Sequence, residues 1–291
     1  MKRMLVIGRR GQVASALAAI DWGQDIVVAL GGRDEFDLAS PAALRDRVKD
    51  MRPDLIVNAG AYTAVDQAES EPEAAFALNR DGPAALAEAA AAIGAPVIQL
   101  SSDYVFDGLK AGAYVETDAV NPLSVYGVSK EAGERALRER LAQHVILRSS
   151  WIYAARGRNF LTTMLRLAGE GREIRVVDDQ KGSPTAAAEL AGAVATIARR
   201  LLAGGADYGT FHFCGQGVTS WHGFATAIFE LAGTGKARLA ATTTAEFNAP
   251  ARRPANSALD CTKIARVYGI RPAPWRESLA RCLGEMEHAG A

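Results

Sequence analysis

Tyr126 and Lys130 are the residues of this sequence whose types and spacing most directly suggest chemistry. In a helix, residues four apart lie on one face, one turn above the other. A free tyrosine has a pKa of about 10, and a positive charge nearby favours its phenolate form and lowers that value. We therefore expect Lys130 to lower the pKa of Tyr126, so that Tyr126 can donate a proton to an oxygen that gains negative charge.

The Tyr-x-x-x-Lys spacing is a short motif, and an exposed helical turn with a surface lysine has the same spacing. Its meaning depends on the elements that position it. Short apolar runs alternate with helical patterns through the first half of the chain, which favours a parallel sheet covered on both faces. The expected strands are residues 4–7, 26–29, 55–58, 97–100 and 145–147, and the expected helices are 12–20, 41–51, 72–92 and 124–142.

The second half is less regular. We expect helices at 159–168, 185–202 and 220–232 and strands at 174–177 and 209–213. The pattern predicts an α/β fold, a Rossmann-type doubly wound parallel sheet with a smaller C-terminal substrate-binding lobe. Residues 1–150 would form the first domain, with its sheet completed by parts of 151–215. Residues 151–291 would form mainly the second lobe, with an interleaved boundary.

Composition excludes several classes of function. Lysine plus arginine and aspartate plus glutamate each number 33 in 291 residues, so no net charge favours nucleic acid or an anionic membrane. The apolar runs are too short to span a bilayer, and the first one meets Arg9 and Arg10, so we expect no export. The three cysteines form no Cys-x-x-Cys pair and the four histidines lack metal-ligand spacing. We expect a cytoplasmic protein with reduced thiols, no metal, no nucleic acid and no membrane partner.

A glycine loop follows the first expected strand. Gly8-Arg-Arg-Gly11-Gln-Val-Ala14 runs from the strand into a helix, which is the setting of a dinucleotide-binding fingerprint. Glycines let the backbone approach a pyrophosphate, which then lies on free N–H groups at the helix N-terminus. Ala14 stands at the third glycine position. An ordinary strand–helix turn is the alternative, but the position after the first strand favours a nicotinamide dinucleotide.

The end of the second expected strand bears on which dinucleotide binds. An NAD site usually has an acidic residue there to hold a ribose hydroxyl. Here Arg33 comes first and Asp34 second, and Arg9 and Arg10 lie inside the glycine loop. Guanidinium groups bind phosphate well, so we expect NADPH to be preferred. Asp34 leaves NADH possible.

Together these motifs resemble a known family. The glycine loop, Asn58-Ala-Gly-Ala61 at a strand end, Ser102 after another strand and Tyr126-x-x-x-Lys130 resemble the extended short-chain dehydrogenases/reductases. Five longer strings resemble one branch of them, the dTDP-4-dehydrorhamnose reductases. They follow in order over almost the whole chain, at 58–73, 101–108, 147–153, 179–185 and 253–259.

The resemblance implies a reaction and a set of residues. The 4-keto group of dTDP-4-dehydro-6-deoxy-L-mannose would be reduced to dTDP-L-rhamnose by hydride from NADPH or NADH, as a step of polysaccharide biosynthesis. Tyr126 would donate the proton, Lys130 would also hold the nicotinamide ribose, and Ser102 would orient the carbonyl. With Tyr126 and Lys130, the residues implied for cofactor binding are Gly8, Arg10, Gly11, Gln12, Val13, Arg33, Asp37, Leu38, Ala59, Gly60, Ala61 and Tyr62. With Ser102, those implied for the sugar nucleotide are Asp103, Tyr104, Trp151, Arg253 and Asn256.

Most of these residues also have an ordinary explanation. Asp103 could form an Asx turn, Tyr104 and Trp151 could fill a core, and Arg253 could make a surface ion pair. One departure from the family concerns a metal. Some members form dimers bridged by a metal ion, such as Mg²⁺, held by glutamates, but residues 14–16 contain no acid here. Because Glu189 alone matches such a position, we expect no bridging Mg²⁺ and leave monomer or homodimer open.

Two other functions compete. A nucleotide-sugar epimerase or dehydratase of the same superfamily would share the tyrosine and lysine. Dehydratases commonly carry an acidic pair beside the catalytic serine or threonine, whereas Ser102 is followed by Asp103 and Tyr104. The regulatory subunit of methionine adenosyltransferase is similar to this family and acts as a binding partner. The full set of Ser102, Tyr126 and Lys130 favours a working active site.

Overall fold

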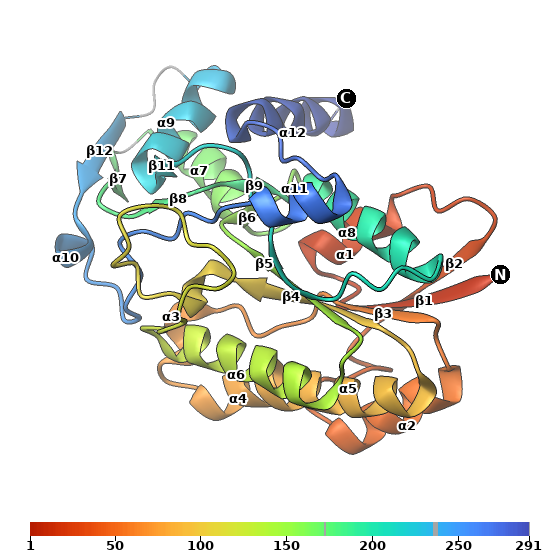
Figure 1. The fold of residues 1–291 in the computed structure, drawn as a ribbon. Coiled ribbons are helices and arrows are strands. Elements are labelled where there is room, and N and C mark those ends of the chain that lie inside the picture. The colour runs from red at the N-terminus through yellow and green to blue at the C-terminus, as the bar shows by residue number, and fades with distance from the viewer. Residues whose placement is uncertain (172, 235–237, 291) are drawn as a thin grey trace.

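The computed structural model describes residues 1–171, 173–234 and 238–290. Its centre is a six-stranded sheet in the order β10-β5-β4-β3-β1-β2 (Figure 1). All neighbouring strands in it run parallel, which confirms the predicted α/β fold. The sixth strand comes from the second half of the chain. The strands are β1 (Lys2–Ile7), β2 (Ile26–Gly31), β3 (Leu55–Asn58), β4 (Val97–Ser102), β5 (His144–Ser149) and β10 (Gly209–His212).

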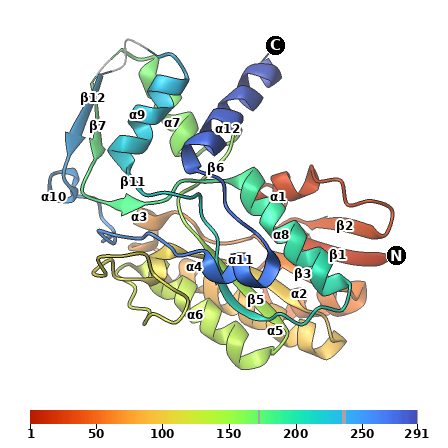
Figure 2. The same ribbon diagram turned by 45° about the horizontal axis from the view of Figure 1, so that its top comes forward.

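Both faces of the sheet are buried because its strands are apolar at successive positions. In β1, Met4 and Val6 enter the core on one face, and Leu5 and Ile7 enter the core on the other. Helices cover both faces, as Figures 1 and 2 show. The first face is covered by α1 (Gln12–Ala18), α8 (Ala187–Leu202) and α11 (Thr262–Tyr268). The second is covered by α2 (Pro41–Met51), α5 (Gly82–Ile93) and α6 (Val125–Arg140).

The helix expected over 72–92 contains a π-helical turn. It consists of α4 (Pro72–Phe76), the π segment Ala77–Asp81 and α5, and it follows the short α3 (Val65–Ala68). Such turns often occur at functional sites. Here the turn carries Asn79, which is 2% exposed. The Asn79 side chain bonds both backbone groups of Tyr62, at 2.9 and 3.1 Å, and donates to the Ser129 hydroxyl at 2.9 Å.

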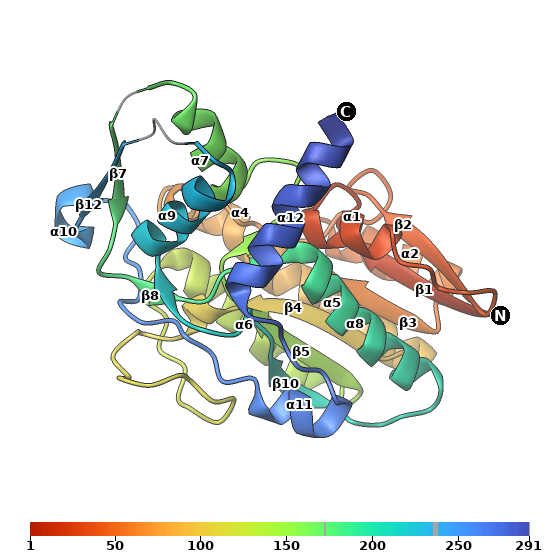
Figure 3. The same cartoon turned by 90° about the horizontal axis from the view of Figure 1, so that it is seen from above.

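The smaller lobe lies beyond the carboxyl ends of the strands (Figure 3) and has its own apolar core, which includes Phe224, Ile228 and Leu279. Its β7 pairs with β12, so the strand expected at 174–177 belongs to a separate two-stranded sheet. The lobe's strands are β6 (Ile152–Tyr153), β7 (Glu173–Val177), β8 (Lys181–Gly182), β9 (Thr185–Ala186), β11 (Thr219–Ser220) and β12 (Arg238–Thr242). Its helices are α7 (Phe160–Ala168), α9 (Trp221–Leu231), α10 (Thr244–Phe247) and α12 (Trp275–Gly290).

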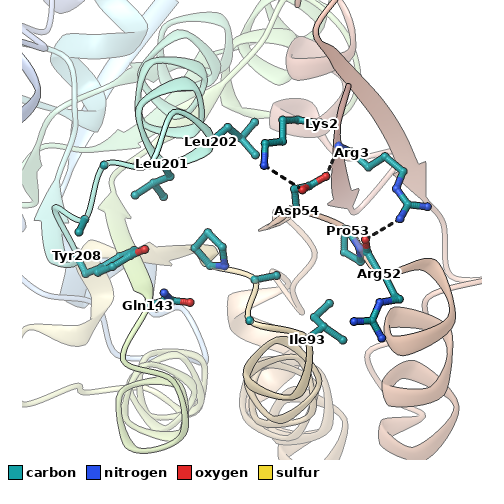
Figure 4. A pocket seen from close by; sticks show the side chains of 16 residues that line it. Lys2, Arg3, Arg52, Pro53, Asp54, Ile93, Gln143, Leu201, Leu202 and Tyr208 are labelled. Carbon is teal, nitrogen blue, oxygen red and sulfur yellow. Dashed lines mark hydrogen bonds and ion pairs between the residues drawn. The ribbon is translucent and has the colours of Figure 1, made fainter.

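A depression of about 560 Å³ lies at the amino ends of the strands (Figure 4). There Asp54 accepts from the Lys2 ammonium group at 3.3 Å and from the Arg3 backbone at 2.8 Å. Open parallel sheets bind their ligands at the opposite, carboxyl edge, so this depression is not the candidate site. Across the described ranges, no helix is long and apolar enough to cross a membrane, and the three cysteines are free thiols.

Candidate active site

The start of α6 is fixed against the turn that follows β4. The Ser124 side chain caps the helix by accepting from the Gly127 N–H at 3.2 Å. A Cβ on Gly127 would lie 2.3 Å from the Tyr104 carbonyl oxygen, so only glycine permits this approach. As a result Tyr126, in the first turn of α6, meets Tyr104 edge to face with ring centroids 5.9 Å apart.

Ser102 ends β4 and joins Tyr126 to Asp103. Its hydroxyl oxygen accepts from the Tyr104 N–H at 3.1 Å and caps the 3-10 turn Asp103–Val105. The hydroxyl also lies 3.0 Å from a carboxylate oxygen of Asp103, and it interacts with the Tyr126 side chain in a way that lowers the Tyr126 pKa. The structure therefore brings together the serine and the tyrosine that the sequence placed 24 residues apart.

Lys130 lies one turn further along α6 and is 5% exposed. Its ammonium group donates to the Leu100 carbonyl oxygen at 2.8 Å. Burial lowers the pKa of Lys130 to about 8, although the negative charge of Glu134 opposes this effect.

The expectation that Lys130 lowers the pKa of Tyr126 is wrong. Burial of the Tyr126 hydroxyl raises its pKa to about 12, and the hydrogen bond with Ser102 only partly offsets this rise. The cause is desolvation, which disfavours the phenolate form. Tyr126 therefore keeps its proton at neutral pH, which is the form that a proton donor needs.

Glu134 continues the stripe of Tyr126 and Lys130 down the same face of α6. It is 1% exposed and accepts from the Ser101 hydroxyl at 2.6 Å and from the Arg148 guanidinium at 2.6 and 2.9 Å. Burial opposes its ionisation, but the bonds from Arg148 and Ser101 outweigh this and lower its pKa. Glu134 thus ties α6 to β4 through Ser101 and to β5 through Arg148.

These contacts set the register between α6 and β4. Leu100 meets Lys130, Ser101 meets Glu134, and Ser102 meets Tyr126, so three consecutive strand residues each hold one residue of the helix stripe. Sequence reasoning missed Glu134. Its spacing was the available signal, because it lies four residues after Lys130 and eight after Tyr126.

The glycine loop is packed against the end of β3. Gly8 has φ of +109°, and a Cβ there would lie 2.9 Å from the Gly60 nitrogen. Gly60 in turn leaves no room for a side chain beside Leu38, which is 4% exposed. Gly11 caps α1 without a side chain, so the N–H groups of the first turn, at Gln12 and Val13, have no side-chain cap. Such a turn suits a pyrophosphate.

The arginines near the end of β2 lie at the surface. Arg9 pairs with Asp34 at 2.9 Å, and its guanidinium lies close to Gly32. The side chain of Arg33 is 79% exposed and lies 3.6 Å from Asp37. Asp37 also accepts from the Ala39 N–H and the Ser40 hydroxyl in the turn before α2. Arg10 is exposed as well.

The segment after β3 is half-buried from Ala59 to Tyr62. The Tyr62 hydroxyl donates to Glu71 at 2.8 Å, and its backbone is held by Asn79. Asn79 is a second residue that sequence reasoning missed. The sequence pattern predicted a regular helix around Asn79, and no local feature of the sequence indicated the π-helical turn that orients its side chain.

Trp151 has an unusual backbone. Its φ is +49°, a left-handed conformation that costs about 1–3 kcal/mol in a non-glycine residue and is typical of functional sites. Its ring stacks on Trp221 with centroids 3.7 Å apart and planes 8° apart. Gly182 leaves room for the ring, since a Cβ there would lie 2.5 Å from it. Trp221, from α9, was not among the expected site residues.

Arg253 and Asn256 are both engaged within the chain. Arg253 makes two hydrogen bonds to Asp66, at 2.8 and 2.9 Å, and its charge also interacts with the Tyr104 side chain. The Asn256 amide donates to the carbonyl oxygens of Lys110 and Gly112 at 2.7 and 3.0 Å. Arg253 therefore reaches the tyrosine beside Tyr126, whereas Asn256 holds the loop around residue 110.

Glu189 makes contacts that neutralise its charge. Its carboxylate accepts from the Ser278 hydroxyl at 2.7 Å and pairs with Arg281 of α12. Within the described ranges, no three histidine, cysteine, aspartate or glutamate side chains gather in a group that could hold a metal ion. Glu189 thus offers a guanidinium-paired carboxylate, which is a poor metal ligand.

Comparison with known proteins gives a consistent result. Residues 1–288 match the family model described as the RmlD substrate binding domain. A dTDP-4-dehydrorhamnose reductase of Sinorhizobium fredii is 49% identical over 285 residues, 96% of each chain. The one from Escherichia coli K12 is 41% identical over 291 residues, 97% of each chain. The crystal structure of the Bacillus anthracis enzyme in complex with NADP has a TM-score of 0.91 and 35% identity, covering 98% of this chain and 100% of that one.

Proposed function

The chain belongs to the RmlD substrate-binding-domain family of dTDP-4-dehydrorhamnose reductases and is an NAD(P)-dependent oxidoreductase, and we propose that it reduces the 4-keto group of dTDP-4-dehydro-6-deoxy-L-mannose. The product is dTDP-L-rhamnose. Hydride from the nicotinamide attacks the carbonyl carbon, and Tyr126 donates the proton to the oxygen. Ser102 orients that oxygen by a hydrogen bond.

One observation carries this proposal. A protonated tyrosine, a serine hydroxyl and a buried ammonium group converge at the carboxyl edge of a parallel sheet, through the contacts of Ser102 with Tyr126 and of Lys130 with Leu100. Ligands of such sheets bind at this edge. The charge of Lys130 favours negative charge that develops on the ketone oxygen, and its remaining N–H groups suit a ribose hydroxyl.

Further residues surround this centre. Gly8, Gly11 and the uncapped first turn of α1 suit the cofactor pyrophosphate, and Ala59 and Gly60 permit a close backbone approach. On the sugar-nucleotide side, Tyr104, Trp151 and Arg253 are contributed by the turn after β4 and by the second lobe. For Arg253 to bind the diphosphate, it must share or exchange its pairing with Asp66.

The test is to incubate the purified protein with the keto sugar nucleotide and NADPH, and to follow NADPH oxidation and the sugar product. We expect steady NADPH oxidation and dTDP-L-rhamnose as the product. An epimerase that keeps its NAD bound would change the sugar without consuming free NADPH, and a regulatory subunit would leave both unchanged. Either result would contradict the proposal.

Cofactor preference gives a separate prediction. The homologue solved with NADP and the exposed Arg33 support NADPH as the preferred cofactor. We expect Arg33→Ala to raise the KM for NADPH about tenfold, or about 1.4 kcal/mol, and to leave the KM for NADH nearly unchanged, because only NADPH has the 2′-phosphate. Arg47→Ala, an exposed arginine of α2, is the matched control. A clear preference of the unmodified protein for NADH would contradict the prediction.

A further inference from the structure

Asp103 is a buried carboxyl group that the proposed reaction does not yet use as an acid. It is 2% exposed, and one of its oxygens, Oδ2, makes no hydrogen bond of normal geometry to any residue that the structure describes. Its other oxygen lies 3.0 Å from the Ser102 hydroxyl, which interacts in turn with the Tyr126 phenol. The Ser102 hydroxyl therefore lies between the Asp103 carboxyl and the Tyr126 phenol.

Each reduction leaves Tyr126 without its proton. The phenolate must be protonated again before the next turnover, and the hydroxyl that touches it is that of Ser102. We propose that the carboxyl group of Asp103 returns a proton to Tyr126, through the hydroxyl group of Ser102, after each reduction. This inference rests on the proposed function, because it needs a reaction that removes the tyrosine proton.

The steps balance. Hydride from the cofactor forms the new C–H bond, and the Tyr126 O–H bond breaks as its proton passes to the ketone oxygen. Ser102 then gives its hydroxyl proton to the phenolate and takes the proton of the Asp103 carboxyl group. The Asp103 carboxylate recovers a proton from solvent as the product leaves. In sum, one hydride and one proton from solvent reduce one ketone, and Ser102 is unchanged.

The acid strengths favour this direction. Burial raises the pKa of Asp103 to about 7, although the neighbouring hydroxyl groups of Ser257 and Ser102 hold the rise in check. Tyr126 has a pKa of about 12, so proton transfer from Asp103 to a Tyr126 phenolate is downhill. Since a hydroxyl group can rotate, the 3.0 Å contact between Ser102 and Asp103 can carry the proton in either direction.

Other titratable groups face Asp103 and could contribute to a pH profile. Those that its charge influences are Tyr104 of the same turn, Tyr126 of α6 and Cys214 after β10, while Lys130 contacts Leu100 and Arg253 interacts with Tyr104, on either side of it in the chain. Lys130 has a pKa of about 8, close to that of Asp103. The midpoint of the pH profile alone cannot distinguish Asp103 from Lys130, so the profile must be assigned to one of them by substitution.

The experiment uses Asp103→Asn, which keeps the shape of the side chain but has no acidic proton to return. The protein with NADPH bound is mixed rapidly with the keto sugar nucleotide, and both the first turnover and the steady state are measured. We expect a first turnover close to that of the unmodified protein, followed by a steady state at least tenfold slower. Asp107→Asn, an aspartate four residues later outside the chain of contacts, should keep both rates.

The pH profile is the second readout. The steady-state rate of the unmodified protein should fall as pH rises through about 7, because Asp103 loses the proton that it returns. In Asp103→Asn this fall should be absent. If Asp103 only binds the sugar, the variant will raise KM, slow the first turnover and keep the fall. That result would overturn the inference.

A third measurement needs no variant and guards against a misfolded one. The steady-state rate of the unmodified protein is measured in mixtures of light and heavy water. Its dependence on the deuterium fraction should indicate that more than one proton is transferred. A dependence on a single proton would contradict the inference. If the unmodified protein never oxidises NADPH with the keto sugar, the proposed function fails. If the unmodified protein does oxidise NADPH, but the first turnover of Asp103→Asn is no faster than its own steady state, only the inference fails.

Discussion

Replacing Tyr126 by phenylalanine is expected to lower kcat about 10²–10⁴-fold, the range by which a positioned general acid accelerates proton transfer. The substitution removes the hydroxyl that contacts Ser102 and leaves the ring beside Tyr104. Because Phe keeps the packing, the affinity for NADPH should change little. Steady-state kinetics and a cofactor titration measure the two effects separately.

The matched control is Tyr208→Phe, at the amino ends of the strands (Figure 4). It makes the same chemical change far from the carboxyl edge, and kcat should stay within twofold of the unmodified protein. If Tyr126→Phe turned over as fast as this control, another group would have to donate the proton. The proposed mechanism would then be wrong, even if the reaction itself were correct.

Glu134→Gln is expected to lower the free energy of unfolding by about 3–5 kcal/mol. The side chains of Glu134 and Arg148 are 1% and 3% exposed, and their closest contact is 2.6 Å. Breaking such a pair leaves a buried guanidinium without its counter-charge, which costs far more than losing a surface ion pair. Denaturant unfolding monitored by circular dichroism would give the difference.

Glu131→Gln is the control on the same helix. Its carboxylate lies 3.8 Å from Arg135 and 3.6 Å from Arg138, whose side chains are 60% and 35% exposed, so its loss should cost about 1 kcal/mol or less. The double substitution Glu134→Leu with Arg148→Met should recover part of the lost stability, because it removes both buried charges. Equal losses for Glu134→Gln and Glu131→Gln would contradict a structural role for the buried pair.

Features set by local patterns could be predicted from the sequence. The apolar strands, the glycine loop and the helix that carries Tyr126 and Lys130 follow from periodicity, caps and turn residues that act over a few positions. α2 begins at Pro41 and ends at Met51, as expected, because proline and an apolar stripe mark its bounds. The place of Ser102 also followed, since a residue at the end of a parallel strand lies at the edge where ligands bind.

Features that depend on distant contacts could not be predicted. The buried pair of Glu134 and Arg148 joins a helix to a strand, and the sign of the Tyr126 pKa shift depends on how deeply its hydroxyl is buried. The stacking of Trp151 on Trp221 unites residues 70 positions apart in sequence. Spacing along the chain carries no measure of desolvation, which outweighed the expected influence of Lys130 on Tyr126.

Hydride transfer from the nicotinamide to C4 of the sugar is the central step of the proposed reaction. The most direct measurement is to supply NADPH that carries deuterium at the transferred position and to examine the product by NMR. The proposed reaction predicts dTDP-L-rhamnose with deuterium bonded to C4 and at no other ring carbon. Product without deuterium at C4, or consumption of the sugar without oxidation of the labelled NADPH, would contradict it.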